Sequence, residues 1–424
     1  MYQSDLKHNN KTLEEKLHAL YTLSGKKNLN LDLFRDTYIQ LLEAFDNPHH
    51  RLPPVIHVAG TNGKGSIIAT LKSIYEAQGY KVHTYTSPHL IRFNERIVLA
   101  GQQIDNQSLE ALIDETLKLN NDRDATFFEA ATAMAFAAFT RVPADICLLE
   151  VGLGGRLDCT NIIEKPAATI ISTIGMDHID YLGDTIEKIA AEKAGIMKTG
   201  APCIIGHQND TKTFKIFEDK ANTIGTTLIH KENLLPNDVT PALPGPHQTK
   251  NINAALTAIK ALQNQFPVKD EAIKKGITSI NWPARLQKLP SEAFGFNDKT
   301  TIWLDGGHNE DAGKAIKNHL QSLSKKGDIA AIFCMMKHKH PKGFISQFAD
   351  HCTTVLTTQI PNEPASLSSE DLSKAISPIA SKPTNTYQDA LNQLKNNPPA
   401  NILITGSLYL AGHILHDLEN SGHN

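Results

Sequence analysis

The sequence has few cysteines, little net charge and no long hydrophobic run. Its five cysteines are scattered among 424 residues and form no CxxC pair, which is typical of free thiols in a reducing cytoplasm. A formal net charge of −3 gives no indication of a nucleic-acid or membrane surface. No apolar run could span a bilayer, and the first residues lack a hydrophobic signal core. We therefore expect a cytoplasmic protein without nucleic-acid or membrane partners.

The length and the order of apolar segments predict two α/β domains. A chain of 424 residues is too long for one core, and its short apolar runs alternate with amphipathic stretches. This alternation favours mainly parallel sheets with helices on both faces. The expected strands are Val55–Ala59, Val82–Thr86, Asp145–Val151, Ala168–Ile174 and Pro202–Gly206, then Thr301–Leu304, Ile329–Met335, Thr353–Thr357 and Asn401–Thr405. We place the boundary in the polar segment Lys288–Lys299, so that the domains are residues 1–290 and 291–424.

Residues 57–66 read HVAGTNGKGS, an apolar run followed by a glycine-rich turn. Three glycines let the backbone N–H groups come close to an anion, and Lys64 adds a full charge. A helix that begins near Ser66 directs its positive end to the same place. The spacing departs from G-x-x-x-x-G-K-S/T, because Val58 stands at the first glycine position and Gly65 follows the lysine. The segment predicts a phosphate-binding loop; a glycine-rich turn without a ligand is the alternative.

Polar side chains follow three other expected strands of the first domain. Ser87 comes after the second strand, and Glu150 ends the third strand ahead of a glycine-rich run. Asp177 and His178 follow the fourth strand. Because parallel strands end at the same edge of a sheet, these groups are expected near the phosphate loop, where they suit Mg²⁺. Taken singly, a helix cap, a surface ion pair and a satisfied polar side chain are the alternative interpretations.

Other candidate residues lie outside these strand ends. Lys193 is on an expected helix among small apolar neighbours, so it can point inward, although a solvated lysine is the default interpretation. Asp305 ends a strand ahead of two glycines, and Arg285, just before the boundary, would suit a phosphate group. His338 and His340 lie in a lysine-rich polar stretch and are interpreted as surface residues rather than metal ligands.

Together these segments resemble the folylpolyglutamate synthase/dihydrofolate synthase family of the Mur ligase superfamily. The resemblance rests on HVAGTNGKGS, TSPHL, RFNERI, TFFEA, EVGLGGRLDCTN, DHIDYLG, EKAGIMK, HQTKN, LDGGHN and ITGSLYLAG, which occur in the family order. The motifs extend from about residue 55 to about residue 412. The resemblance implies a P-loop-type, mainly parallel ATP-binding domain with a folate pocket, followed by a smaller Rossmann-like glutamate-ligase domain.

The resemblance implies ATP-dependent amide formation between a carboxylate and L-glutamate. ATP would phosphorylate the carboxylate, and the amine of glutamate would then displace phosphate from the acyl phosphate. The implied activities use dihydropteroate and reduced folates as acceptors, in a monomer with ATP and one or two Mg²⁺ ions. The alternatives are an enzyme with the second activity only and a nucleotide-binding switch without ligase chemistry. A Mur-type ligase would need a UDP-sugar-binding domain, for which the roughly fifty residues ahead of the loop are too few.

The resemblance also implies roles for individual residues. The ATP contacts would be Thr61, Asn62, Gly63, Lys64, Gly65, Ser66, Asn251, Arg285 and Asp305. The metal ligands would be Ser87, Glu150 and His178, and the folate pocket would include Thr126, Phe127, Phe128, Glu129, Leu157, Asp158 and Cys159. Lys64, His178 and Lys193 would take part in catalysis, with Lys193 carbamylated and therefore negatively charged near a second metal ion. The sequence shows three departures from the family pattern: Ala284 in place of glycine, Gly307 to Glu310 in place of Ala-His-Asn-Pro, and His338 and His340 in place of aspartates.

Overall fold

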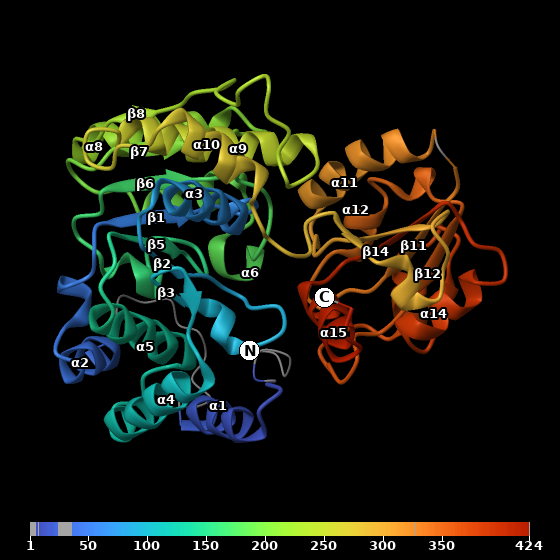
Figure 1. The fold of residues 1–424 in the computed structure, drawn as a ribbon, viewed down its shortest axis with the longest axis horizontal. Coiled ribbons are helices and arrows are strands. Elements are labelled where there is room, and N and C mark those ends of the chain that lie inside the picture. The colour runs from blue at the N-terminus through green and yellow to red at the C-terminus, as the bar shows by residue number, and fades with distance from the viewer. Residues whose placement is uncertain (1–5, 7, 24–35, 326, 424) are drawn as a thin grey trace. The chain divides into compact units, whose positions relative to one another are not determined.

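The computed structural model describes residues 6, 8–23, 36–325 and 327–423, which form two compact units (Figure 1). The first unit contains the described residues from Leu6 to Ala242 together with Gln248–Asn281. The second contains Leu243–His247 and the described residues from Trp282 onward. Each unit is built around its own mainly parallel sheet, which confirms the predicted α/β class. The division into domains 1–290 and 291–424 stays a prediction.

The first unit has an eight-stranded sheet with the order β4-β3-β2-β5-β1-β6-β7-β8. Its strands are β1 (Val55–Ala59), β2 (Val82–Tyr85), β3 (Ile97–Leu99), β4 (Gln102–Gln103), β5 (Ile146–Glu150), β6 (Ala168–Ile171), β7 (Cys203–Ile205) and β8 (Leu228–Ile229). Strands β2, β5, β1, β6, β7 and β8 run parallel to one another, and β3 and β4 add an antiparallel edge next to β2. Every residue of β1 and β5 is buried, which explains why both segments contain few polar residues.

Helices connect and cover these strands. They are α1 (Lys11–Leu23), α2 (Asp36–Ala44), α3 (Lys64–Gln78), α4 (Asn106–Asn120), α5 (Phe127–Arg141), α6 (Ile179–Leu182), α7 (Ile186–Ala194), α8 (Lys212–Ile224), α9 (Pro246–Ala261) and α10 (Asp270–Thr278), with short 3-10 helices η2 (Pro48–His50), η3 (Phe93–Arg96) and η4 (Cys159–Ile162). Helix α3 packs on β1, β2 and β5 and against α10, whereas α7 and α8 pack against each other. Among the described helices, none is long and apolar enough to cross a membrane.

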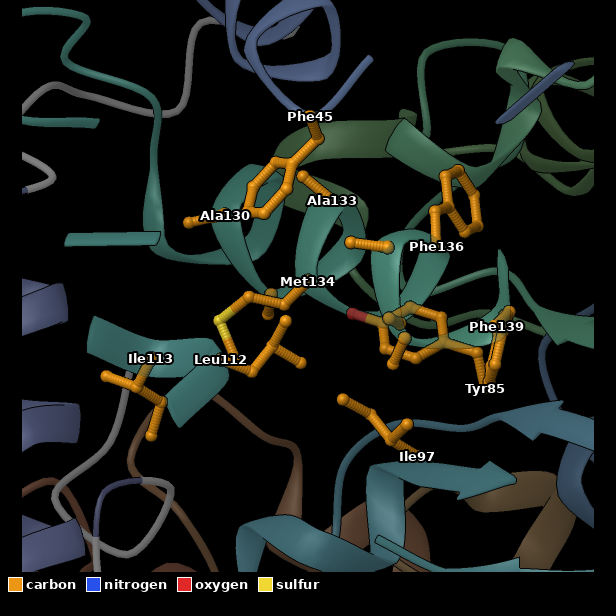
Figure 2. Close-up of a cluster of buried hydrophobic side chains, with 14 of the residues drawn as sticks. Phe45, Tyr85, Ile97, Leu112, Ile113, Ala130, Ala133, Met134, Phe136 and Phe139 are labelled. Atoms are coloured by element: carbon orange, nitrogen blue, oxygen red, sulfur yellow. The ribbon is translucent and has the colours of Figure 1, made fainter. Parts of the chain in front are cut away.

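Helix α5 lies at the centre of the largest buried cluster of the first unit (Figure 2). Its sequence, FFEAATAMAFAAFTR, is apolar around most of its circumference, which is typical of a buried helix. In Figure 2 its side chains Ala130, Ala133, Met134, Phe136 and Phe139 are surrounded by Tyr85 and Ile97 near the sheet, by Leu112 and Ile113 of α4, and by Phe45. This packing fixes the position of the first turn of α5, which carries four of the predicted folate-pocket residues.

The second unit has a six-stranded sheet with the order β13-β12-β11-β14-β10-β9. Its elements are β9 (Gln287–Leu289), η5 (Ser291–Phe294), β10 (Thr301–Leu304), α11 (Glu310–Leu323), β11 (Ile329–Phe333), α12 (Pro341–Ile345), η6 (Ala349–His351), β12 (Thr354–Thr357), α13 (Ser369–Ala375), β13 (Lys382–Pro383), α14 (Tyr387–Leu394), β14 (Asn401–Thr405) and α15 (Leu408–Asn420). Strand β9 runs antiparallel to β10, and the other pairings are parallel. The core includes a stack of Phe333 on Phe344.

Candidate active site

The turn after β1 forms the predicted phosphate loop. Gly63 has a φ of 94°, in the region that favours glycine, and α3 begins immediately afterwards at Lys64. The backbone N–H groups of Thr61 and Asn62 both donate to the carbonyl oxygen of Thr173, at 3.0 and 3.2 Å. The Thr61 hydroxyl also donates to the Gly175 carbonyl at 3.0 Å. The loop is therefore held in shape by the segment that follows β6.

Lys64 begins α3 directly after this loop, and Asn251 of α9 lies against the loop. The Lys64 ammonium donates to the carbonyl oxygens of Gly60 and Thr61, at 3.1 and 3.4 Å. A Cβ atom on Gly63 would lie 2.3 Å from Oδ1 of Asn251, so glycine allows α9 to approach the loop. The first N–H groups of α3, including those of Gly65 and Ser66, have no acceptor within the helix and can bind an anion. The predicted ATP residues of the first unit are thus brought together.

Ser87 and Glu150 lie at the ends of neighbouring parallel strands, β2 and β5. Oε2 of Glu150 accepts a hydrogen bond from the backbone N–H of Ser87 at 3.2 Å. Glu150 is buried and pairs in register with Val58 of β1, directly ahead of the phosphate loop. The structure therefore places two of the three predicted metal ligands together beside the phosphate loop.

His178, the third predicted ligand, begins α6 with a φ of 52°. Its backbone N–H donates to Oδ1 of Asp177 at 2.9 Å, and its ring Nε2 lies 4.0 Å from Oδ2 of the same carboxylate. This segment continues from Gly175, which is hydrogen-bonded to Thr61 of the phosphate loop. No group of three or more His, Cys, Asp or Glu side chains is arranged for a metal within the described part of the chain. A metal here would need mixed ligands, including a hydroxyl and oxygens from water or phosphate, as Mg²⁺ commonly has.

Lys193, near the end of α7, is buried in the first unit. A Cβ atom on Gly155 would lie 2.9 Å from Cα of Lys193, so the glycine-rich segment after β5, residues 152–155, passes directly over the lysine backbone. Burial, and to a smaller extent the charge of Lys64, lower the pKa of Lys193 from 10.5 to about 7, although the charge of Asp177 acts in the opposite direction. A substantial share of this amine is therefore neutral at neutral pH, and the neutral form is the nucleophilic one.

The pKa of Lys193 predicts a stability that rises with pH. Between about pH 7 and 10.5 the unfolded chain binds a proton at this lysine that the folded chain does not hold, so the free energy of unfolding increases with pH. We expect a contribution of up to about 1.4 kcal/mol per pH unit in this window. Urea unfolding of the wild type and of Lys193→Met, in bicarbonate-free buffers, should show a shallower pH slope in the variant. Equal slopes would contradict the shifted pKa.

Residues Thr126 to Glu129 form the start of α5. Oε2 of Glu129 accepts from the backbone N–H and the hydroxyl of Thr126, at 2.6 and 2.8 Å, in a capping box. Phe127 points into the core against Phe93, with ring centroids 6.1 Å apart. Phe128 instead faces the glycine-rich segment, because a Cβ atom on Gly152 would lie 2.4 Å from its Cζ atom. Of these four residues, Phe128 is therefore the one that lines this segment, and the others shape the turn.

Leu157, Asp158 and Cys159 lie where the glycine-rich segment ends. Oδ2 of Asp158 accepts from the backbone N–H groups of Gly152 and Leu153, both at 3.0 Å, and Oδ1 accepts from that of Thr160 at 2.9 Å. Burial raises the pKa of Asp158, and these hydrogen bonds oppose the rise. Leu157 is half-buried, and the carbonyl of Cys159 accepts from the Tyr38 hydroxyl at 3.1 Å. The Asp158 carboxylate is therefore engaged in shaping its own segment.

Gln208 contributes to the phosphate-loop region but was not predicted from the sequence. Its Nε2 donates to the carbonyls of Ser172 and Gly206 at 3.0 and 3.1 Å, and its Oε1 accepts from the N–H of Ile174 at 3.1 Å. These bonds join the ends of β6 and β7 and fix the segment to which Thr61 and Asn62 bind. A polar residue shortly after the apolar run of β7 is the sequence signal that could have found it.

Arg285 and Asp305, the other two predicted ATP residues, lie together in the second unit. Oδ2 of Asp305 accepts from the N–H of Leu286 at 2.9 Å, and Oδ1 accepts from that of Gly307 at 2.8 Å. Arg285 is flanked by two non-glycine residues of positive φ, Ala284 at 57° and Leu286 at 47°. The alanine that replaces the usual glycine therefore adopts the left-handed conformation, which the Asp305 carboxylate helps to hold.

Asp305→Ala should destabilise the second unit by about 2–4 kcal/mol, because the buried N–H of Leu286 and the partly buried N–H of Gly307 lose their acceptor next to strained residues. Denaturant unfolding measures this change. Asp311→Ala is the matched control, since Asp311 lies in the first turn of α11 and pairs with Lys314 near the surface. The control should lose no more than about 1 kcal/mol. Equal losses in the two variants would remove the special role of Asp305.

Comparison with known proteins identifies a family for both units. Residues 58–233 match the Mur ligase middle domain, and residues 294–417 match the dihydrofolate synthetase C-terminal domain. A dihydrofolate synthase/folylpolyglutamate synthase of Bacillus subtilis is 32% identical over 408 residues, which cover 88% of this chain and 92% of that protein.

Two solved structures extend the comparison to the fold. E. coli FolC in complex with DHPP and ADP has a TM-score of 0.83 at 27% identity, covering 96% of this chain and 98% of that one. A bifunctional folylpolyglutamate synthase/dihydrofolate synthase from Yersinia pestis, complexed with AMPPNP and Mn ion, has a TM-score of 0.82 at 26% identity, covering 95% and 98%. Because the similarity extends over nearly the whole length of these proteins, the chain belongs to the dihydrofolate synthase/folylpolyglutamate synthase family.

Proposed function

We propose that this chain is an ATP-dependent ligase that joins L-glutamate to dihydropteroate and to reduced folates. The observation that carries the proposal is the phosphate loop with Lys64, beside the buried strand-end carboxylate Glu150, in a chain of this family. A nucleotide-binding switch would not need a buried lysine of lowered pKa next to the same loop, and Lys193 therefore favours the ligase.

The reaction divides into two steps that the loop residues can support. In the first, an oxygen of the acceptor carboxylate forms a bond to the γ-phosphorus, and the bond to the leaving ADP breaks. In the second, the neutral amine of glutamate attacks the acyl carbon, loses a proton and expels phosphate. Lys64 and the N-terminal N–H groups of α3 offset the negative charge of the transferring phosphoryl group. The phosphate contacts proposed in the first unit are Thr61, Asn62, Gly63, Lys64, Gly65, Ser66 and Asn251.

We also propose that Ser87, Glu150 and His178 hold Mg²⁺, as one or two ions. Glu150 is buried at the strand end with Ser87, and its carboxylate is a hard oxygen ligand of the kind that Mg²⁺ prefers. The Mn ion and AMPPNP in the Yersinia pestis relative support a divalent ion with the nucleotide. Such an ion would neutralise part of the negative charge of the ATP phosphates. Carbamylation of Lys193, which its lowered pKa favours, would place a further anion at this end of α7.

The acceptor pocket is proposed along the glycine-rich segment. Phe128 offers a half-buried aromatic face there, and Leu157 and Cys159 lie at the end of the segment. Thr126, Phe127, Glu129 and Asp158 belong to the same pocket, where their hydrogen bonds and packing support the wall. In the second unit, Arg285 and Asp305 are proposed as additional ATP contacts.

We propose that the protein is located in the cytoplasm and is a monomer. All five cysteines are free in the structure, and two of them, Cys147 and Cys334, are fully buried, where burial raises the thiol pKa and suppresses reactivity. Free thiols are typical of a reducing compartment.

The experiment that tests the function is ADP release with Mg-ATP and L-glutamate, comparing dihydropteroate with tetrahydrofolate as acceptor. Turnover with both acceptors is the expected result. Turnover with tetrahydrofolate alone would leave a folylpolyglutamate synthase and would contradict the dihydrofolate synthase activity. ATP binding that is unaffected by acceptor and glutamate, without turnover, would support the switch instead.

A further inference from the structure

We propose that His57 is a positioning residue that fixes the Asp158 carboxylate through the hydroxyl of Thr160. The glycine-rich segment, residues 152–155, is thereby held in one position. This inference rests on the proposed function, because it takes that segment as a wall of the acceptor pocket.

The first link joins β1 to η4. His57 is fully buried in β1, between Leu149 of β5 and Thr169 of β6. Its Nε2 lies 2.8 Å from Oγ1 of Thr160. That hydroxyl donates its one proton to Oδ1 of Asp158, so it accepts from His57, which must carry its proton on Nε2.

The ring of His57 stays neutral in this arrangement. Burial, and to a smaller extent the charge of Lys198, lower the pKa of His57 from 6.5 to about 3. The imidazole therefore does not take up a proton near neutral pH, and the direction of the hydrogen bonds stays the same. The contact acts as a fixed donor rather than as a pH switch.

The second link joins η4 to the glycine-rich segment. Oδ1 of Asp158 is held by the hydroxyl and the N–H of Thr160, while Oδ2 accepts from Gly152 and Leu153. Asp158 is itself buried, so these donors take the place of water around its charge. A carboxylate that turns away would release both N–H groups at the start of the segment.

The segment has little room to move. Phe128 and the backbone of Lys193 lie so close to Gly152 and Gly155 that a Cβ atom at either glycine would approach them within 3 Å. A small displacement of the segment therefore moves the Phe128 face or the Lys193 backbone. Since a shift of one ångström can cost a large factor in rate, the position of Asp158 matters for acceptor binding.

A purely structural role for His57 is the competing explanation. Nδ1 of His57 is buried and has no hydrogen-bond partner in the structure. An orphaned ring nitrogen costs stability, and leucine, which is of comparable size, would avoid that cost. The donor on Nε2 is thus the feature of histidine that leucine cannot replace.

Two substitutions at this position separate the explanations. His57→Leu removes the donor, and we expect the KM for dihydropteroate to rise about tenfold while the KM for ATP changes by less than about twofold. Its melting temperature should equal or exceed that of the wild type, because the orphaned nitrogen is gone. His57→Gln places an amide N–H near the position of Nε2 and should restore most of the acceptor KM.

Thr160→Val tests the path. It removes the hydroxyl that accepts from His57 and donates to Asp158, so its effect on the acceptor KM should be at least that of His57→Leu, and the double variant should be no worse than Thr160→Val alone. His83→Leu is the matched control. His83 is a buried histidine of β2, and its ring forms hydrogen bonds with the carbonyl of Val142 and the N–H of Ala100. Its loss should lower stability and leave the acceptor KM unchanged.

Hydrogen exchange gives a readout that does not depend on activity. In His57→Leu, the amides of Gly152 and Leu153 should exchange at least about tenfold faster than in the wild type, and His57→Gln should reverse the change. Unchanged exchange at these amides would overturn the proposal. An ATP KM that rises as much as the acceptor KM would also overturn it, because the effect would not be specific to the acceptor wall. A wild type without turnover would contradict the proposed function alone, and the exchange data would still decide the role of His57.

Discussion

Lys193→Ala should abolish ligase turnover, by at least about 10²–10³-fold, and should leave ATP binding near normal. Lys193 is buried beside the glycine-rich segment. Burial and the charge of Lys64 lower the pKa of its amine, so part of the amine is neutral at neutral pH. The hydrogen bonds that hold the phosphate loop to the segment after β6 do not involve Lys193, so nucleotide affinity should persist. ADP release and calorimetric titration with the non-hydrolysable AMPPNP measure the two quantities separately.

Lys198→Ala is the matched control for that experiment. Lys198 follows the same helix, burial lowers the pKa of its amine too, and its Nζ donates to the carbonyl of Asn161 at 3.1 Å. A lowered pKa alone would therefore make both lysines equally important, whereas the proposed function assigns turnover to Lys193. Full turnover in Lys193→Ala would remove this lysine from the mechanism. Loss of turnover in both variants would point to damage of the glycine-rich segment instead of a chemical role.

The parts of the fold that the sequence predicted are those with strong local signals. β1, β10 and β14 have the predicted bounds, because each is a short apolar run that ends at a polar or glycine residue. The short strands β3, β4 and β9 were not predicted, since two or three residues carry no periodicity. The sequence of Phe344–Ala349 favours a helix there, whereas α12 begins at Pro341, a residue whose fixed φ suits the first turn of a helix.

In the candidate site, too, the residues with strong local sequence signals were predicted and the long-range contacts were not. Thr61 to Ser66 form one continuous motif, and Ser87 and Glu150 follow predicted strands, so the rule that parallel strands end at one edge was sufficient. The hydrogen bonds of Asp158, Gln208 and His57 could not be predicted from the positions of strand ends. His57 meets Thr160 across 103 positions of the chain, and a lone histidine in an apolar run gives no indication of its partner.

Lys64→Ala should lower ATP affinity and turnover by at least about 10²-fold, because the variant removes a full positive charge and the other donors of the loop are uncharged. The lysine donates to the carbonyls of Gly60 and Thr61 in the structure, so its ammonium already lies over the turn. Equilibrium binding of Mg-ATP and steady-state ADP release measure the effect.

Lys72→Ala is the control on the same helix, since Lys72 pairs with Glu76 at 2.9 Å one turn away. An ATPase rate unchanged in Lys64→Ala would refute the phosphate loop, and equal losses in both variants would show that α3 as a whole had been disturbed. A selective loss at Lys64 would establish that the loop binds phosphate despite its unusual glycine spacing.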